Sequence, residues 1–146
     1  MNVITGQTVK VNTDDKTPKI LYASNNASSQ LLVQKLFAGK CIVDPAFDGI
    51  EAMWLIGKNN YSLVMADYML KHVNGFDVLN NLKEQKGRNF PVLLLSSVKK
   101  SEVLQEYPKL NSKVDEVIMI PFERDYLVPT VLNYINGYSV NASSNL

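Results

Sequence analysis

Short runs of apolar residues alternate along the chain with longer segments in which apolar residues recur every three or four positions. A short run that is apolar throughout is typical of a strand buried on both faces, whereas the longer spacing predicts a helix with one buried side. Each predicted strand is followed by a predicted helix. The five expected strands are residues 20–23, 41–43, 63–66, 92–95 and 116–120.

Capping residues mark where the predicted helices begin and end. Asn25 and Asn26 are typical turn and N-cap residues before the first helix, and Gly39 is expected to end it. Asp48, followed three residues later by Glu51, forms a capping box for the second helix. The fourth helix is expected at 101–107, before Pro108, and the last at about 124–138. The expected buried stripes are Leu32, Val33, Leu36 and Phe37; Ile50, Met53 and Trp54; Phe76, Leu79 and Leu82; and Leu127, Val131 and Ile135.

This alternation predicts the fold class. The connections between strands are too long for hairpins, and strands that are apolar throughout need helices on both faces of their sheet. We therefore expect an α/β domain with a doubly wound five-stranded parallel sheet. The domain is expected at residues 19–138, between a flexible arm at residues 1–18 and a polar tail at residues 139–146.

Composition and charge narrow the class of protein. The chain has 146 residues, of which 46% are hydrophobic and 20% charged, as in ordinary globular domains. A formal net charge of +1 indicates neither a nucleic-acid nor a membrane partner. No apolar run is long enough to span a bilayer, and the single Cys41 is expected to be a small buried hydrophobe. We therefore predict a cytoplasmic protein.

In doubly wound folds, ligands bind beyond the carboxyl ends of the strands. The candidate site residues are therefore those that follow each predicted strand. They are Ser24 and Asn25 after the first strand, Asp67 after the third, Ser96 after the fourth and Ile120 after the fifth.

Several of these segments resemble a known family. The stretch YSLVMADYMLKHVNGFDVL has an aspartate closing the third strand and a glycine eight residues later; PVLLLSS ends the fourth strand with a hydroxyl, and IPF follows the fifth. In this order and spacing, they resemble the receiver domains of bacterial two-component response regulators over about residues 19–138. The resemblance implies a flavodoxin-like sheet with strand order 2-1-3-4-5. It also implies that Asp67 stands where the family accepts a phosphoryl group from a histidine kinase.

Other residues of the family's chemical set are replaced. Ser24 and Asn25 stand where two acidic residues hold Mg²⁺, and Ile120 stands where a lysine neutralises the phosphoryl group. Val117 replaces the aromatic switch residue, whereas Ser96 keeps the hydroxyl. One carboxylate, an amide and a hydroxyl are a poor ligand set for Mg²⁺, which prefers anionic oxygens. We therefore expect weak or absent Mg²⁺ binding, no cofactor and no enzymatic activity.

Four features have a second interpretation. Asp67 is either a phosphoacceptor or a polar strand cap tied to backbone amides or to Lys71, and we favour the cap. Ser96 is expected to be a loop hydroxyl rather than a phosphate ligand. His72 is expected to be a surface histidine rather than a phosphate carrier or metal ligand. The tyrosines of the last helix fit a protein interface as well as partial burial; they are Tyr126, Tyr134 and Tyr138.

These observations predict a stand-alone pseudo-receiver that acts as a phosphorylation-independent protein-interaction module in signal transduction. Its expected contact surface, for a protein partner or for self-association, is the face of the fourth helix, the fifth strand and the last helix. One alternative is a receiver still phosphorylated at Asp67 by a non-standard route. The other is a flavodoxin-like cofactor-binding protein, although no glycine-rich phosphate loop follows the first strand.

Overall fold

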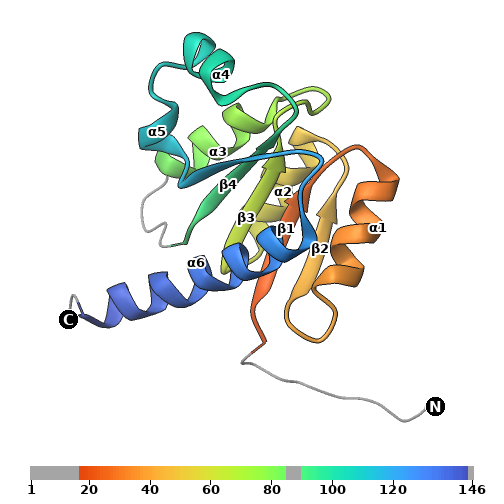
Figure 1. Cartoon of the computed structure of the whole chain (residues 1–146), viewed down its shortest axis with the longest axis vertical. Helices are drawn as coiled ribbons and strands as arrows, with labels where there is room; N and C mark the ends of the chain where they lie inside the picture. Colours follow the sequence, from red (N-terminus) through yellow and green to blue (C-terminus); the bar gives the residue numbers. More distant parts are fainter. Residues whose placement is uncertain (1–16, 85–89, 145–146) are drawn as a thin grey trace.

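The computed structural model describes residues 17–84 and 90–144, which form a five-stranded parallel sheet with helices on both faces (Figure 1). The strand order is β2-β1-β3-β4-β5 and every neighbouring pair is parallel, which confirms the predicted doubly wound sheet with order 2-1-3-4-5. The elements are β1 (Lys19–Ala23), α1 (Ala27–Leu36), β2 (Ile42–Ala46), α2 (Gly49–Lys58), β3 (Leu63–Asp67), α3 (Gly75–Glu84), β4 (Val92–Ser96), α4 (Lys100–Glu106), α5 (Leu110–Lys113), β5 (Glu116–Met119) and α6 (Arg124–Ser144).

The sheet separates two apolar cores, because successive side chains of a strand point to opposite faces. Helices α1 and α6 cover one face, and α2 and α3, with α4 and α5, cover the other (Figure 1). Cys41 is buried in the first core, as expected. The helix residues packed on the sheet include Val33, Phe37, Leu127 and Val131 on the first face, and Ala52, Leu79, Val103 and Leu110 on the second.

The predicted capping residues make hydrogen bonds at the starts of α1 and α2, although Glu51 bonds the residue before the N-cap. The Oδ1 atom of Asn26 accepts from the backbone N–H of Ser29 at 2.9 Å, which makes Asn26 the N-cap of α1. Asp48 caps α2 by accepting from the N–H of Glu51 at 2.8 Å, while the Glu51 carboxylate accepts from the N–H of Phe47 at 2.7 Å. Both helices therefore begin where the sequence indicated.

The buried side of α2 is different from the predicted one. Ile50, Met53 and Trp54 were expected to face the core, but all three are exposed. The helix buries Gly49 and Ala52 instead. Gly49 has the close contact that sets this rotation, because a Cβ atom there would lie 2.1 Å from the carbonyl oxygen of Val73. Apolar residues occur nearly all round this helix, so hydrophobicity alone could not identify its buried side.

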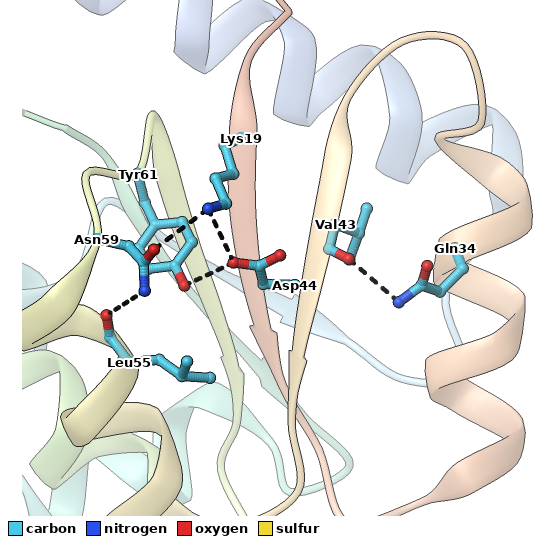
Figure 2. Close-up of polar contacts among 7 residues, drawn as sticks. All are labelled: Lys19, Gln34, Val43, Asp44, Leu55, Asn59 and Tyr61. Atoms are coloured by element: carbon cyan, nitrogen blue, oxygen red, sulfur yellow. Dashed lines mark hydrogen bonds and ion pairs between the residues drawn. The ribbon is translucent and has the colours of Figure 1, made fainter. Parts of the chain in front are cut away.

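A polar network holds the other end of α2 on the sheet (Figure 2). Lys19 of β1 donates to Asn59 Oδ1 at 3.2 Å and pairs with Asp44 of β2 at 3.4 Å. Asn59, the C-cap residue of α2, donates to the carbonyl of Leu55 at 3.0 Å. The hydroxyl of Tyr61 donates to Asp44 at 2.9 Å. The rotation of α2 is therefore held at both of its ends.

Other expectations about the helices need correction. Leu32 of α1 is about half exposed, whereas Val33 and Phe37 are buried. The short helix α5 was not predicted, because it follows directly after the helix-breaking Pro108. Helix α6 does not end near residue 138 but continues to Ser144, so residues 139–144 of the expected tail are helical. Residues 1–16 of the expected arm lie outside the described residues. Among the described helices, none has the length and hydropathy to cross a membrane.

Candidate functional site

The predicted site residues meet at the carboxyl edge of the sheet. Parallel pairing aligns Ala23 of β1 with Ala66 of β3, and Asp67 with Leu95 of β4. Asp67 therefore lies between the ends of β1 and β4, next to the segment that begins with Ser24. The backbone N–H of Ile120 donates to the carbonyl of Ser96 at 3.0 Å, so these two residues also lie together at this edge.

Asp67 has a partner that sequence reasoning missed. The hydroxyl of Tyr22 donates to Asp67 Oδ1 at 2.9 Å, and its ring is buried. The strand pairing explains this contact, since Tyr22 is aligned with Met65 and Asp67 follows Met65 by two residues. Side chains two residues apart leave the same face of a sheet. The sequence signal that could have predicted this contact is a tyrosine on one strand and an acidic residue at the end of the neighbouring strand.

The environment disfavours the charged form of Asp67. Burial raises the pKa of the Asp67 carboxyl above its ordinary value of 3.8, while hydrogen bonds from Ser24 and Tyr22 act in the opposite direction. Burial and then the nearby Asp67 raise the pKa of Tyr22, so this phenol keeps its proton and remains a donor. Asp67 is thus a half-buried strand-end carboxylate that is tied to the side chains of Tyr22 and Ser24, rather than to Lys71.

We expect the substitution Asp67→Asn to stabilise the fold at neutral pH. An amide keeps the acceptor for Tyr22 and removes the cost of holding a carboxylate in this environment. The native state of the wild type binds the Asp67 proton more tightly than the unfolded chain does, so its stability falls as pH rises from 3.8 through the raised pKa. The advantage of the variant should therefore be absent in acid, grow through this window and stay constant above it.

Thermal unfolding of both proteins between about pH 3 and pH 8 tests this prediction, because the window begins near the ordinary carboxyl pKa. At neutral pH, a gain of about 1 kcal/mol would raise Tm by about 2–4 °C in a domain near this size. A variant that is less stable at neutral pH, or whose advantage shrinks as pH rises, would contradict the assignment of a raised pKa to Asp67.

The two residues at the acidic-pair positions have different surroundings. Ser24 is buried and its Oγ atom accepts from the N–H of Asn26 at 3.1 Å, which shapes the turn into α1. Asn25 is exposed and lines an open cleft of about 770 Å³ beside the loop after β3. Gln30, which the sequence analysis did not single out, is buried and donates through Nε2 to the carbonyls of Tyr22, Ser24 and Ala46.

These residues do not fit a magnesium ion. Mg²⁺ binds anionic oxygens in a near-octahedral shell. The strand ends supply the single carboxylate of Asp67, and one of its oxygens already accepts the Tyr22 hydrogen bond. No group of three or more His, Cys, Asp or Glu side chains that could hold a metal occurs within residues 17–84 and 90–144.

The remaining predicted positions have local structural roles. Ser96 is the buried last residue of β4, and its hydroxyl donates to the carbonyl of Val98 at 2.7 Å and accepts from its N–H at 2.9 Å. Ile120 packs against the core under α1 and α6, and Val117 packs against the opposite core. His72 is an exposed histidine whose Nδ1 atom lies 3.5 Å from the carboxylate of Asp48.

The loop after β3, which follows Asp67, contacts the end of helix α4. The hydroxyl of Tyr68 donates to Glu106 at 2.5 Å, and the Asn74 side chain donates to the hydroxyl of Tyr107 at 2.7 Å. The Tyr107 ring in turn stacks on Phe76, with ring centroids 4.1 Å apart. Side-chain hydrogen bonds and ring packing therefore hold α4 against the loop.

The sequence model of the response regulator receiver domain family matches residues 11–132. This chain belongs to that family. It is a receiver domain of two-component signalling, and the strand order and the position of Asp67 agree with the resemblance seen in the sequence.

The relatives of this chain include transcriptional regulatory proteins. The receiver domain is 31% identical over 114 residues to the transcriptional regulatory protein TctD of Salmonella typhimurium, covering 75% of this chain and 48% of TctD. It is 32% identical over 114 residues to DltR of Streptococcus agalactiae, covering 77% and 50%. The chain thus spans about half the length of these relatives. A solved receiver domain of Francisella response regulator 1452 superposes with a TM-score of 0.74 at 30% identity, covering 83% of this chain and 98% of that one.

Proposed function

We propose that this receiver domain is a pseudo-receiver, a phosphorylation-independent protein-interaction module in signal transduction with no enzymatic activity. The observation that carries the proposal is the environment of Asp67, where the hydroxyl of Tyr22 occupies one carboxylate oxygen. Ser24 and Asn25 add no anionic ligand beside it. Membership of the receiver family favours this function over that of a flavodoxin-like cofactor binder.

Electrostatics argue against the family's ordinary phosphoryl transfer at Asp67. Catalysis of phosphoryl transfer consists mainly of positioning and of neutralising charge on the transferred group. At an effective dielectric constant near 20, each missing unit charge about 4 Å away forfeits on the order of 4 kcal/mol of attraction before solvation offsets it. Here Ser24 and Asn25 stand in place of the acidic pair that would hold the metal, and Ile120 stands in place of the lysine.

The switch that reads phosphorylation is also replaced. Val117 is a branched apolar residue packed on the core, with no ring to change rotamer. Ile120, at the lysine position, offers a phosphoryl oxygen neither a charge nor a donor from its side chain. No two-state element that phosphorylation could bias remains at these two positions.

The proposed partner surface is the face formed by α4, β5 and α6. Met119 of β5 and Tyr126 of α6 both expose large apolar side chains on this face. The hydroxyls of Tyr126 and Tyr134 both donate to the carboxylate of Glu116. These bonds hold α6 rings beside β5, and aromatic residues are enriched at protein interfaces.

We expect beryllofluoride with Mg²⁺, a mimic of an acyl phosphate, to leave the amide NMR spectrum of this receiver domain unchanged. The physical reason is that Ser24 and Asn25 supply no carboxylate for the metal, and the side chain of Ile120 supplies no charge to hold the added anion. A small phosphodonor should likewise leave no label on the protein. Shifts that spread from Asp67 to α4, or label that is lost in Asp67→Asn, would show instead that Asp67 is still phosphorylated by a non-standard route.

A further inference from the structure

Helix α2 presents an apolar face to solvent. Ile50 is 57% exposed, Trp54 is 61% exposed and Met53 is 38% exposed, and Phe47, 47% exposed, stands just before the helix. These side chains lie outside both cores because small residues pack the opposite side of α2 on the sheet. A group of large apolar side chains on one surface, including the only tryptophan of the chain, indicates an interaction site.

The charges of α2 are arranged symmetrically about Trp54. Glu51 stands in the first turn of the helix and Lys58 is its last residue. A helix has about 3.6 residues per turn, so Glu51 lies about 60° and Lys58 about 40° from Trp54 around the helix axis, both in the same direction. Trp54 is close to their midpoint along the axis. Opposite charges at nearly equal distances from a centre make this surface complementary to itself.

We infer that this chain self-associates through α2, with the α2 helices of two copies packed antiparallel about a two-fold axis near Trp54. A two-fold axis perpendicular to the helix leaves each residue on the same lateral side of the interface. It reverses the position of that residue along the helix axis. Glu51 therefore meets Lys58 of the partner subunit, and this pair occurs twice, as in any isologous interface. A helix with one sign of charge would instead match a different protein of opposite charge.

The other side of the same helix also fits this arrangement. Ile50 and Gly57 lie about 40° and 60° from Trp54, on the side away from the charges. Ile50 therefore comes to lie over the partner subunit's Gly57. A Cβ atom at Gly57 would meet no atom within 4 Å, so there is room for an approaching side chain. Antiparallel packing covers the apolar side chains and pairs the charges at once.

The α2 contact is separate from the proposed partner face and from Asp67. Helix α2 packs on β1 and β2, and β2 and β5 are at opposite edges of the sheet. The face of α4, β5 and α6 therefore stays open when two copies meet through α2. Asp67 takes no part in the contact, so a phosphorylation assay can fail or succeed independently of it.

The oligomeric state of the full chain and the emission of Trp54 test the inference together. Sedimentation across a range of protein concentrations should show a monomer–dimer equilibrium, with Trp54 emission shifting to the blue as the dimer forms. Ile50→Glu should weaken the dimer at least tenfold, because it places a charge in the apolar contact. Met119→Glu, which changes a similarly exposed apolar residue on β5, should leave the dimer unchanged.

Charge reversal tests the antiparallel arrangement. Lys58→Glu alone and Glu51→Lys alone each turn two attractive pairs into repulsive ones, so each should weaken the dimer about tenfold at low salt. Mixing the two variants should restore it, because both pairs become attractive again between unlike chains. Circular dichroism checks that each variant is folded. A wild type that stays monomeric, a dimer lost in Met119→Glu but not in Ile50→Glu, or variants that do not recover on mixing would overturn the inference.

Discussion

A triple variant of this receiver domain should bind Mg²⁺ and accept a phosphoryl group on Asp67, neither of which we expect of the wild type. Ser24→Asp and Asn25→Asp place two carboxylates beside Asp67, at the positions where the family holds its metal. Ile120→Lys adds the charge that neutralises the phosphoryl group. The three changes should act as a unit, because metal and lysine serve the same group, so single substitutions should do little.

The structure adds a fourth change to this design. The hydroxyl of Tyr22 donates to Asp67 Oδ1 and so occupies one of the two carboxylate oxygens. Tyr22→Phe removes this donor and keeps the buried ring. We therefore expect the quadruple variant to take up more label than the triple variant, while Tyr22→Phe alone takes up none.

The added charges should lower the stability of the triple and quadruple variants when Mg²⁺ is absent. Without metal, crowded carboxylates repel one another and the new lysine loses the apolar packing of Ile120, so both variants should be less stable than the wild type. Millimolar Mg²⁺ should recover part of this loss by binding only the folded state, and the wild type should show no such gain. Thermal unfolding with and without Mg²⁺ measures this effect, and labelling from a small phosphodonor measures the chemistry.

Adding Asp67→Asn to the triple variant is the matched control for labelling, because it removes only the acceptor. If the triple and quadruple variants fold but show neither Mg²⁺-dependent stabilisation nor label at Asp67, these strand ends do not form one pocket around Asp67. The assignment of Ser24, Asn25 and Ile120 to the family's positions would then be wrong.

Gly75→Ala should destabilise the domain strongly. A Cβ atom at Gly75 would lie 2.1 Å from the backbone carbonyl oxygen of Asp67 and 2.8 Å from its carbonyl carbon. Backbone atoms cannot move aside as a side chain can, and the N–H of Gly75 also donates to the carbonyl of Tyr68 at 3.0 Å. We expect a loss of about 3 kcal/mol, or roughly 6–12 °C in Tm.

Gly137→Ala, within helix α6, is the matched control, since it makes the same chemical change where a Cβ atom would meet no atom within 4 Å. Alanine is favoured over glycine in a helix, so this variant should gain about 0.5–1 kcal/mol. Chemical denaturation of the two variants beside the wild type measures the difference. Equal effects of the two substitutions would contradict the prediction, because they would show that the backbone of Asp67 does not exclude a Cβ atom at position 75.

Helix α2 shows why the sequence predicted an element and not its orientation. The capping box of Asp48 and Glu51 is a local signal, because it depends on residues three positions apart, and it marked the first turn correctly. The buried side depends on the approach of Gly49 to Val73, and these residues are distant in the chain. The apolar residues around the helix offered no contrast from which that side could be predicted.

The sequence by itself determined the five parallel strands and the place of Asp67 at the end of β3, because continuous apolar runs and capping residues are local patterns. Its family resemblance supplied the strand order and the replaced positions, Ser24, Asn25 and Ile120. Only the tertiary structure decided that Tyr22 donates to Asp67, and that α2 exposes Ile50 and Trp54. Both depend on close packing between segments far apart in the chain, and such contacts leave no periodic signal in a single sequence.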